Sequence, residues 1–394
     1  MEWNLATKAD SGVKIPDEWV FLPYYEAYNL LFRIENALRV FVYVILKEEF
    51  KSKWHEVQVI GDEADGTIDA IAKRRMEQSS SYGYLGHRIL CPIMHLTSGE
   101  LTRLVTSDAY WRLFRPNFLG KLDVIKTKLE EIGTIRNSLA HFRPIRQDDV
   151  EVLKQNSKQV LAGVEDFLKQ ILDQRDVVPT NTTDEWYTRL SALGSEHCSC
   201  SLYQSRDQQW IDARLSYSCP EQRWNTRHDD FLAVHLLTLK SSAVPVLSVG
   251  LRDNMIYLME SVDRPHTDKS GGIKCAKRLS LVFSRKTLSA KLGTLEDSFK
   301  KLLECIEEET GLMLKDNLAR GQVVTPAQVA ASKPEDTGGA SWDWTYDELS
   351  TPVQECDSPE YWGSTLCTRL GHFISATPEY PWMPVKVSGD VIPF

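Results

Sequence analysis

Two residues near the middle of the chain have side chains suited to phosphate chemistry. Arg136 and His141 lie five positions apart in the segment IRNSLAH, residues 135–141. An arginine is permanently charged, and its forked guanidinium binds two phosphate oxygens. The imidazole of a histidine titrates near neutral pH and can take or give a proton. The pair therefore indicates cleavage of a phosphodiester, in which one group holds the phosphate and the other moves a proton.

A helix is expected to carry this pair, because the residues before it are amphipathic. Apolar residues recur at intervals of three and four, at Leu122, Ile125, Leu129, Ile132 and Ile135. Such spacing is typical of one helix face, and at helical spacing residues four or five apart can share a face. We expect this helix to span about residues 119–139. Pro144 should prevent its continuation.

Further helices are expected on both sides of this one. The apolar spacing of Ile34, Leu38, Phe41 and Ile45 predicts a helix over residues 24–50. The segment TSGE, residues 97–100, has the pattern of a capping box and predicts a helix start. Two more helices are expected, over residues 67–78 and 147–173. Residues 1–178 should therefore form an all-α domain of four or five helices.

The Arg-Asn-x-x-x-His pattern of residues 136–141 resembles the motif of the HEPN domain, a helical domain of RNA-cleaving toxins and defence proteins. The segment IENALRVFV, residues 34–42, looks like the first helix of the HEPN domain in one branch of that family. The helix start before the motif looks like LTSGELTRLV, residues 96–105. The resemblance covers about residues 19–175. It implies a HEPN-like helical bundle in an N-terminal domain.

The resemblance also implies an activity, namely metal-independent endoribonuclease cleavage without a cofactor. The 2′-hydroxyl of RNA would attack the adjacent phosphate and leave a 2′,3′-cyclic phosphate and a 5′-hydroxyl. His141 would move the proton, Arg136 would stabilise the transition-state charge, and Asn137 would hold the phosphate or the imidazole. Two motifs would face each other across a homodimer. A bacterial toxin or antiphage defence effector is the setting that the family implies.

Glu35 has two interpretations. It is four residues before Arg39, so the two can form an ordinary ion pair on a helix surface. The resemblance instead implies that Glu35 faces the site and orients Arg136.

A second group of residues could bind the RNA strand. Three adjacent cations close a helix and are followed by aromatic and basic residues, a combination that can hold a nucleic-acid backbone and stack a base. The candidates are Lys73, Arg74, Arg75, Tyr82 and Arg88. The simpler alternative is a solvated helix end, where cations also suit the helix dipole.

The residues after a polar linker at 177–183 have a different pattern, and we recognise no family for residues 180–394. Alternating apolar residues predict strands at 211–217 and 279–283, and a hairpin is expected over 244–259 about residues 252–254. A helix should begin at Thr294 and stop at Gly311, and irregular structure is expected from about 331. Residues 179–394 should thus form an α+β domain. Its expected role is that of a sensor or brake, which could bind a trigger or inhibitor protein.

Composition limits the alternatives. Residues 1–175 carry 24 basic and 25 acidic side chains, whereas the remainder carries 22 and 30, so any RNA site must be a local patch. Eight cysteines in 394 residues do not indicate a disulfide scaffold. We expect no signal peptide at residues 1–12, no membrane span, and a cytoplasmic location. His197, Cys198, Cys200, Cys219 and His228 could be taken for zinc ligands, but their spacing matches no standard zinc finger.

The competing interpretation is a non-catalytic module. HEPN helices also serve for dimerisation and ligand binding, and the Arg-Asn-x-x-x-His pattern can be a buried hydrogen-bonded network. The two interpretations differ in exposure, because catalysis requires Arg136 and His141 to line a cleft rather than a dry core.

Overall fold

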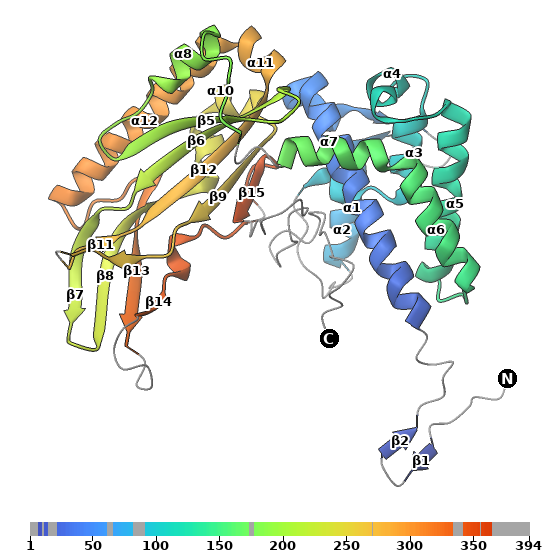
Figure 1. The fold of residues 1–394 in the computed structure, drawn as a ribbon, viewed down its shortest axis with the longest axis horizontal. Helices are drawn as coiled ribbons and strands as arrows, with labels where there is room; N and C mark the ends of the chain where they lie inside the picture. Colours follow the sequence, from blue (N-terminus) through green and yellow to red (C-terminus); the bar gives the residue numbers. More distant parts are fainter. Residues whose placement is uncertain are drawn as a thin grey trace. The chain divides into compact units, whose positions relative to one another are not determined.

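The computed structural model describes residues 7–9, 12–14, 22–60, 66–81, 91–172, 177–269, 271–333, 342–354 and 356–364. They combine helices and sheets, which confirms the expected mixed α+β class (Figure 1). The chain divides into two compact units, one of residues 1–42, 59–65 and 96–167, the other of residues 43–58, 66–95 and 168–394. Both units draw on the first 178 residues, and the expected domain boundary at 178 stays a prediction.

The first unit is mainly helical, with short strands at residues 7–9 and 12–14 before its first helix. Its helices, of which α1 and α7 continue into the second unit, are α1 (Leu22–Phe50), α3 (Ser98–Thr106), α4 (Trp111–Phe114), the 3-10 helix η4 (Arg115–Asn117), α5 (Leu122–Ala140), α6 (Gln147–Val160) and α7 (Ala162–Leu172). The expected capping box is confirmed at the start of α3, where the Glu100 carboxylate accepts from the Thr97 backbone N–H at 2.7 Å. No helix in the described parts of the chain is long and apolar enough to cross a membrane.

The core of the first unit forms around Phe41 on α1. Its ring lies 5.7 Å from that of Phe114, 5.8 Å from that of Phe118 and 5.3 Å from that of Phe167, measured between centroids. Helix α5 packs with the apolar stripe that the sequence predicts, and four of its members are buried, namely Ile125, Leu129, Ile132 and Ile135. This stripe fixes the rotation of α5 and therefore decides which way its last turn faces.

The helix expected over residues 147–173 is two helices, α6 and α7, which meet at Leu161. The expectation of one continuous helix was therefore wrong. Gly163 supplies a physical reason, since a Cβ atom there would lie 2.2 Å from the backbone oxygen of Asn117. The start of α7 thus approaches a neighbouring backbone more closely than any side chain permits.

The second unit contains two sheets. The five-stranded sheet has the order β15-β9-β12-β6-β5 and the four-stranded sheet the order β14-β13-β8-β7; all pairs are antiparallel except β15 with β9. The expected strands at 211–217 and 279–283 are confirmed. The strands are β5 (Cys198–Gln204), β6 (Trp210–Ser218), β7 (Glu221–Arg227), β8 (Phe231–Leu239), β9 (Tyr257–Val262), β12 (Ala276–Ser284), β13 (Val324–Ser332), β14 (Asp343–Thr345) and β15 (Tyr361–Ser364).

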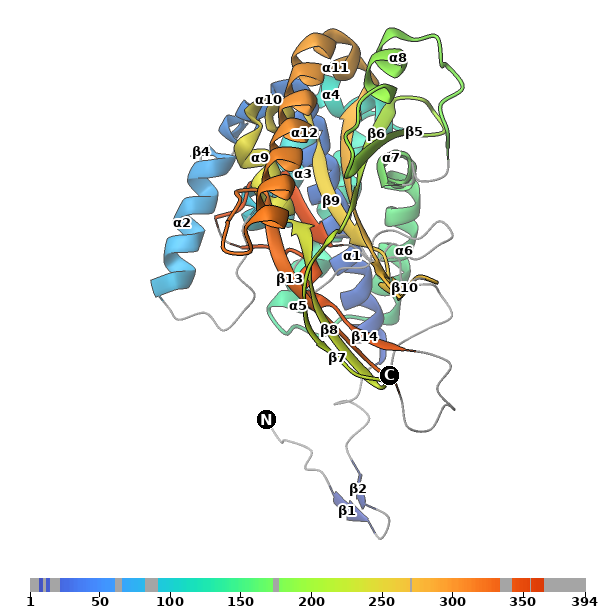
Figure 2. The same cartoon turned by 90° about the vertical axis from the view of Figure 1, so that its left-hand side faces the viewer.

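Helix α12 (Leu292–Lys315) lies across these strands, as Figures 1 and 2 show. It buries Leu295, Phe299, Leu302, Leu303, Ile306 and Met313 in the core that the strands share. Gly311 does not stop the helix, contrary to the sequence expectation, and the chain continues helical to Lys315. Burial of Met313 beyond the glycine outweighs the helix propensity that glycine loses, about 1 kcal/mol relative to alanine.

The hairpin expected over 244–259 was wrong. Residues 244–254 form two short helices, and only β9 is a strand. Pro245 stands in the first turn of α9, where its missing N–H costs nothing, whereas it would remove a ladder hydrogen bond from a strand. The segment from 331 is also more regular than expected, since it holds the end of β13 together with β14 and β15.

The remaining elements are short. They are β1 (Thr7–Ala9), β2 (Gly12–Lys14), η2 (Lys51–Glu56), β3 (Gln58–Val59), β4 (Gly66–Thr67), α2 (Ile68–Ser81), η3 (Pro92–His95), α8 (Glu185–Ser191), η5 (Ser241–Ala243), α9 (Val244–Leu247), α10 (Val249–Asn254), β10 (His266–Thr267), β11 (Ile273–Lys274), α11 (Arg285–Ala290) and η6 (Asp347–Leu349). Helix α2 confirms the helix expected at 67–78.

The last two turns of α1 belong to the second unit and carry a buried lysine–glutamate contact. Lys47 is 1% exposed, forms an ion pair with Glu360, and donates to the carbonyl of Arg252 at 3.0 Å. Tyr43, one turn earlier, donates its hydroxyl to the carbonyl of Ile256 at 2.6 Å. A single helix therefore carries core residues of both units.

Candidate active site

The end of α5 places the motif residues at the surface of the first unit. Ile135 is the last buried member of the apolar stripe, and Arg136 follows it, one helical step away from the core. The side chain of Arg136 is 32% exposed. His141 is the C-cap residue of α5, and its backbone N–H bonds the carbonyl of Asn137 at 3.1 Å. His141 is exposed. Neither residue lies in a dry core.

Glu35 on α1 joins Arg136 to a second arginine. One carboxylate oxygen, Oε2, lies 3.4 Å from Nε of Arg136. The other, Oε1, pairs with Nη2 of Arg39. Glu35 thus forms ion pairs with both Arg39, at i, i+4 on α1, and Arg136 on α5. That it orients Arg136 for catalysis stays a prediction. Glu35 is only 13% exposed, so its attraction for both cations is weakly screened by water.

Arg39 also belongs to this site, although the sequence predicted it only as the ion-pair partner of Glu35 on a helix surface. Its guanidinium donates to the carbonyl of Leu96 at 3.1 Å and to Oδ1 of Asn36 at 3.3 Å. Burial lowers the pKa of Arg39, the Glu35 carboxylate acts against this, and the neighbouring Arg136 cation lowers the pKa further. The two arginines therefore repel each other, and Glu35 is the carboxylate between them.

The arrangement leaves the outer part of Arg136 available to a ligand. Its Nε is held by Glu35, and Nη1 lies 3.3 Å from Oδ1 of Asn137. A guanidinium fixed through one edge can present its remaining N–H groups to a phosphate without losing its orientation. Asn137 is exposed beside it and can itself contact the same ligand. Arg136, Asn137 and His141 are therefore partly or fully exposed polar side chains near the C-terminal end of α5.

The turn that follows α5 contains a left-handed backbone position, which glycine usually occupies. The N–H of Phe142 bonds the carbonyl of Leu139 at 3.0 Å, and the N–H of Arg143 bonds that of Ser138 at 2.8 Å, which is the Schellman pattern. Phe142 occupies the left-handed position of this motif, with a φ of 55°. That conformation costs a non-glycine residue about 1–3 kcal/mol. Burial of the ring does not offset this cost, since Phe142 is 97% exposed.

The residues expected to bind the RNA strand do not gather around Arg136 within one compact unit. Lys73, Arg74 and Arg75 are on α2, which belongs to the second unit. Lys73 forms an ion pair with Asp69 at 2.8 Å, Arg74 is exposed, and Arg75 donates to the carbonyl of His95. Tyr82 and Arg88 lie outside the described residues. The role of these five residues in RNA binding stays a prediction.

Two of the residues weighed as zinc ligands, His197 and Cys198, have surroundings that differ from those of a zinc site. Nδ1 of His197 lies 2.9 Å from Oε1 of Glu307 on α12. Burial raises the pKa of the Cys198 thiol to about 12, which disfavours the thiolate that zinc requires. Within the described ranges, one cluster has metal-ligand spacing, formed by Glu196, His197 and Glu307, and it lies in the second unit.

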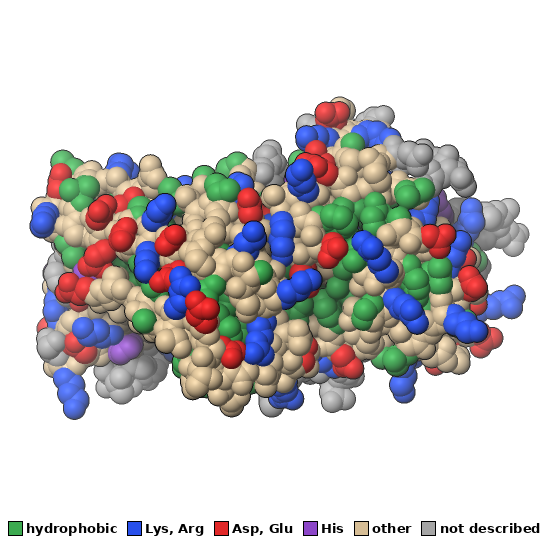
Figure 3. Space-filling model, turned by 90° about the horizontal axis from the view of Figure 1, so that it is seen from above, with side chains coloured by type: hydrophobic (Ala, Val, Ile, Leu, Met, Phe, Trp, Pro, Cys, Tyr) green, Lys and Arg blue, Asp and Glu red, His purple; other side chains and the backbone are tan. Residues whose placement is uncertain are grey.

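Charges of both signs are interspersed on the face shown in Figure 3, with apolar side chains exposed between them. Residues 1–175 are nearly balanced in charge, so any anion site among them must be a local group of cations. A scan against protein-family models and searches of curated proteins and of solved structures find no match to this chain.

Proposed function

We propose that this protein is a metal-independent endoribonuclease of the HEPN type, whose catalytic groups are Arg136 and His141. The observation that carries the proposal is the partly exposed guanidinium of Arg136, ion-paired through Nε with the largely buried Glu35 near the same helix end as the exposed His141. A buried structural network would satisfy both side chains internally. Here both residues reach solvent, where a phosphodiester can contact them.

The proposed reaction uses a nucleophile that RNA itself supplies. His141 takes the proton from a 2′-hydroxyl, the oxygen attacks the adjacent phosphorus, and the bond to the 5′-oxygen of the next nucleotide breaks. The leaving oxygen takes up a proton, and the products are a 2′,3′-cyclic phosphate and a 5′-hydroxyl. Arg136 stabilises the charge that develops on the phosphate oxygens, and Glu35 holds Arg136 in place for this role. General acid–base catalysis of this kind contributes roughly 10²–10⁴-fold.

The reaction needs a base and an acid, whereas the motif of one subunit offers one imidazole. We propose that a homodimer supplies the second, with the ends of two α5 helices facing across a two-fold axis. In such a dimer Arg136 would lie within about 10 Å of its counterpart, a distance at which two cations repel unless an anion sits between them. The RNA phosphate would be that anion.

The proposed setting is the cytoplasm of a bacterium, as a toxin or antiphage defence effector. An enzyme that cuts RNA harms its own cell if it is always active. We propose that the second unit restrains or triggers it. The acidic balance of residues 176–394, with 22 basic and 30 acidic side chains, suits contact with a basic partner rather than with RNA.

The direct test is incubation of the purified protein with total RNA, with and without EDTA. We expect cleavage in both, with cyclic phosphate ends. Arg136→Ala and His141→Ala should each abolish it, whereas the exposed Arg112→Ala and His266→Ala serve as matched controls and should cleave normally. If the wild-type protein cuts no RNA although it is folded, the competing non-catalytic role in dimerisation or ligand binding replaces the nuclease. Strict dependence on magnesium or manganese would contradict the mechanism.

The shared site can be tested by mixing subunits. Wild-type chains are exchanged with chains carrying both Arg136→Ala and His141→Ala, and activity is measured against the fraction of wild-type chain. A shared site predicts a loss steeper than dilution alone. A straight line through the origin, or full activity of a monomer, would show that each subunit works by itself.

A further inference from the structure

The turn after α5 contains a residue that the fold does not explain. Phe142 adopts a φ of 55° in the position where a Schellman motif usually has glycine, and its side chain is 97% exposed. A glycine would satisfy the same two backbone hydrogen bonds, from Phe142 to Leu139 and from Arg143 to Ser138, without strain. The aromatic ring therefore has a conformational cost, and its burial within the chain offsets almost none of it.

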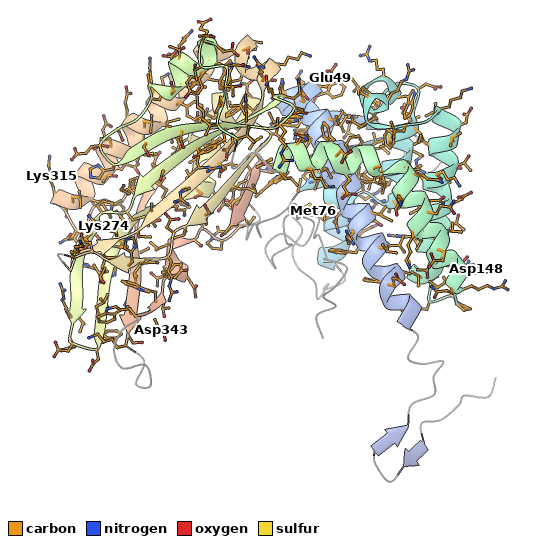
Figure 4. All side chains as sticks on the ribbon, in the orientation of Figure 1. Glu49, Met76, Asp148, Lys274, Lys315 and Asp343 are labelled. Atoms are coloured by element: carbon orange, nitrogen blue, oxygen red, sulfur yellow. The ribbon has the colours of Figure 1, made fainter. Side chains whose placement is uncertain are left out.

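The same turn fixes the backbone that carries the ring. The two hydrogen bonds fix the backbone on both sides of Phe142, and Asp149 accepts from the backbone N–H of Arg146 at 2.7 Å where the next helix begins. In Figure 4 the label of Asp148 marks that first turn of α6, beside the end of α5. An exposed ring on a fixed backbone loses little freedom when a flat ligand covers it, which favours binding.

The charges around the ring indicate what kind of flat ligand fits. The segment HFRPIR, residues 141–146, carries two arginines and a histidine and no acid. Arg143 and Arg146 are exposed on it, and Arg136 stands between one and two turns before the ring. The acidic residues Asp148 and Asp149 follow on α6, and the second of them is engaged at the helix start. An exposed aromatic ring among cations is the arrangement by which proteins bind single-stranded nucleic acids.

We infer that Phe142 is a stacking platform for an unpaired base of single-stranded RNA, next to the scissile phosphate. This inference rests on the proposed function, because it assigns the phosphate to Arg136 and His141. Phe142 directly follows His141, so the base on its ring belongs to a nucleotide that adjoins the bond to be cut. A duplex keeps its bases stacked on one another, and the site therefore selects unpaired segments such as loops and single strands.

The first measurement reads stacking without cleavage. Phe142→Trp places an indole at the platform, and its fluorescence is compared with that of the wild-type protein during titration with a short single-stranded RNA of mixed sequence. The RNA carries 2′-O-methyl groups, so it has no nucleophile and stays intact. We expect quenching by the single strand and none by the corresponding duplex. Equal responses of variant and wild type to the single strand would overturn the inference.

The second measurement separates the ring from the backbone. Phe142→Gly relieves the positive φ, so its unfolding midpoint should rise, while its affinity for the same RNA should fall about tenfold, within the range expected for one stacked base. Phe142→Leu keeps an apolar side chain without a ring and should lose affinity equally. Leu119→Ala, at a residue that is 86% exposed in the same unit, is the matched control and should bind as the wild type does.

The remaining outcomes are also decisive. Sedimentation of the same variants shows whether Phe142 instead contacts a second copy of this chain: a dimer weakened by Phe142→Gly with RNA affinity unchanged would overturn the inference. If the wild-type protein cuts no RNA but the indole of the Phe142→Trp variant is still quenched by single strands alone, the proposed nuclease fails and the platform stands. If RNA is cut and no quenching is seen, only the platform fails.

Discussion

At the scale of single residues, the site depends on one carboxylate shared by two arginines. Glu35 contacts Nε of the partly exposed Arg136 and Nη2 of the more buried Arg39, which is 14% exposed. The two contacts differ in energetic importance. An exposed ion pair contributes about 0–1 kcal/mol to stability, whereas removing the partner of a buried charge costs more, because the charge left behind stays desolvated.

This difference predicts a small loss of stability for Arg136→Ala and a larger one for Glu35→Ala. Arg136→Ala should change the free energy of unfolding by less than about 1 kcal/mol and abolish RNA cleavage. Glu35→Ala should cost about 1–3 kcal/mol, because it leaves Arg39 without its carboxylate, and should also reduce cleavage, because Arg136 loses its anchor. Urea denaturation and a cleavage assay measure the two effects. A Glu35→Ala protein as stable as Arg136→Ala would show that Arg39 does not need the carboxylate.

At the scale of elements, two glycines in the helices of the first unit have different roles. Gly133 lies within α5, and outside its chain neighbours and the adjacent helix backbone no atom lies within 4 Å of the position that a Cβ would take. Gly163 lies at the start of α7 against the backbone of Asn117. Gly133→Ala should therefore stabilise the protein by about 0.5–1 kcal/mol, and Gly163→Ala should destabilise it by about 1–3 kcal/mol. Thermal unfolding of the pair checks both signs, and stabilisation by Gly163→Ala would contradict the close approach.

The pair of His197 and Glu307 ties the start of β5 to α12 and gives stability a pH dependence. Burial raises the pKa of Glu307, but hydrogen bonds from His197 and Ser195 outweigh it, so the pKa in the folded protein lies below the ordinary value of 4.5. A carboxyl with a lowered folded-state pKa stabilises above its unfolded-state pKa, and this contribution is lost as pH falls through the folded value.

As pH falls from above the ordinary carboxyl pKa to below it, the wild-type protein should therefore lose more stability than Glu307→Gln, which cannot titrate at this position. Glu308→Gln, at the exposed neighbouring residue, should lose as much as the wild type. The midpoint of urea unfolding at several pH values measures the difference. Parallel curves for all three proteins would show that the pair contributes nothing to the acid sensitivity.

The helices with regular apolar spacing could be predicted from the sequence, and those decided by tertiary contacts could not. The stripe on α5 and the capping box of α3 are local patterns, so they were found. The break before α7 depends on the backbone of Asn117, which is remote in sequence from Gly163. Continuation of α12 past Gly311 depends on burial of Met313. The hairpin wrongly predicted over residues 244–259 could have been avoided from the sequence itself, because Pro245 disfavours a strand.

In the candidate site, likewise, the residues that are close in sequence could be predicted, whereas the contacts between helices could not. Arg136, Asn137 and His141 are close in sequence, so the end of one helix carries all three. The contact between Glu35 and Arg136 joins two helices, and only the family resemblance suggested it. Arg39 was named as the partner of Glu35, but its contacts with Leu96 and Asn36 and its proximity to Arg136 required the folded structure.

At the scale of the whole molecule, α1 belongs to both compact units. Glu35 lies in its first part, and Lys47 lies further along, in the part that joins the second unit. Lys47 is almost completely buried against Glu360, so removal of either charge leaves the other without its ion-pair partner away from water. The C-terminal half of the chain therefore contributes directly to the stability of the helix that carries Glu35.

Lys47→Met should accordingly cost roughly 3–5 kcal/mol, the range for a broken buried ion pair. The double variant Lys47→Met/Glu360→Gln should recover a large part of this, since it removes both charges of the pair. Lys53→Met, at an exposed lysine of η2, is the matched control and should change stability by less than about 0.5 kcal/mol. Chemical denaturation provides the values. A single variant as stable as the control would mean that Glu360 finds water or another partner.

The same ion pair has a consequence for the order of events during synthesis. The partner of Lys47 is 313 residues further along the chain. A ribosome adds about 5–20 residues per second, so Glu360 emerges roughly 15–60 s after Lys47. During that interval α1 lacks the acid that neutralises its buried lysine, and the helix that positions Glu35 for Arg136 cannot reach its final stability. In a nascent chain, the proposed catalytic surface would thus reach its final stability only after Glu360, in the unit proposed to restrain it, has been made.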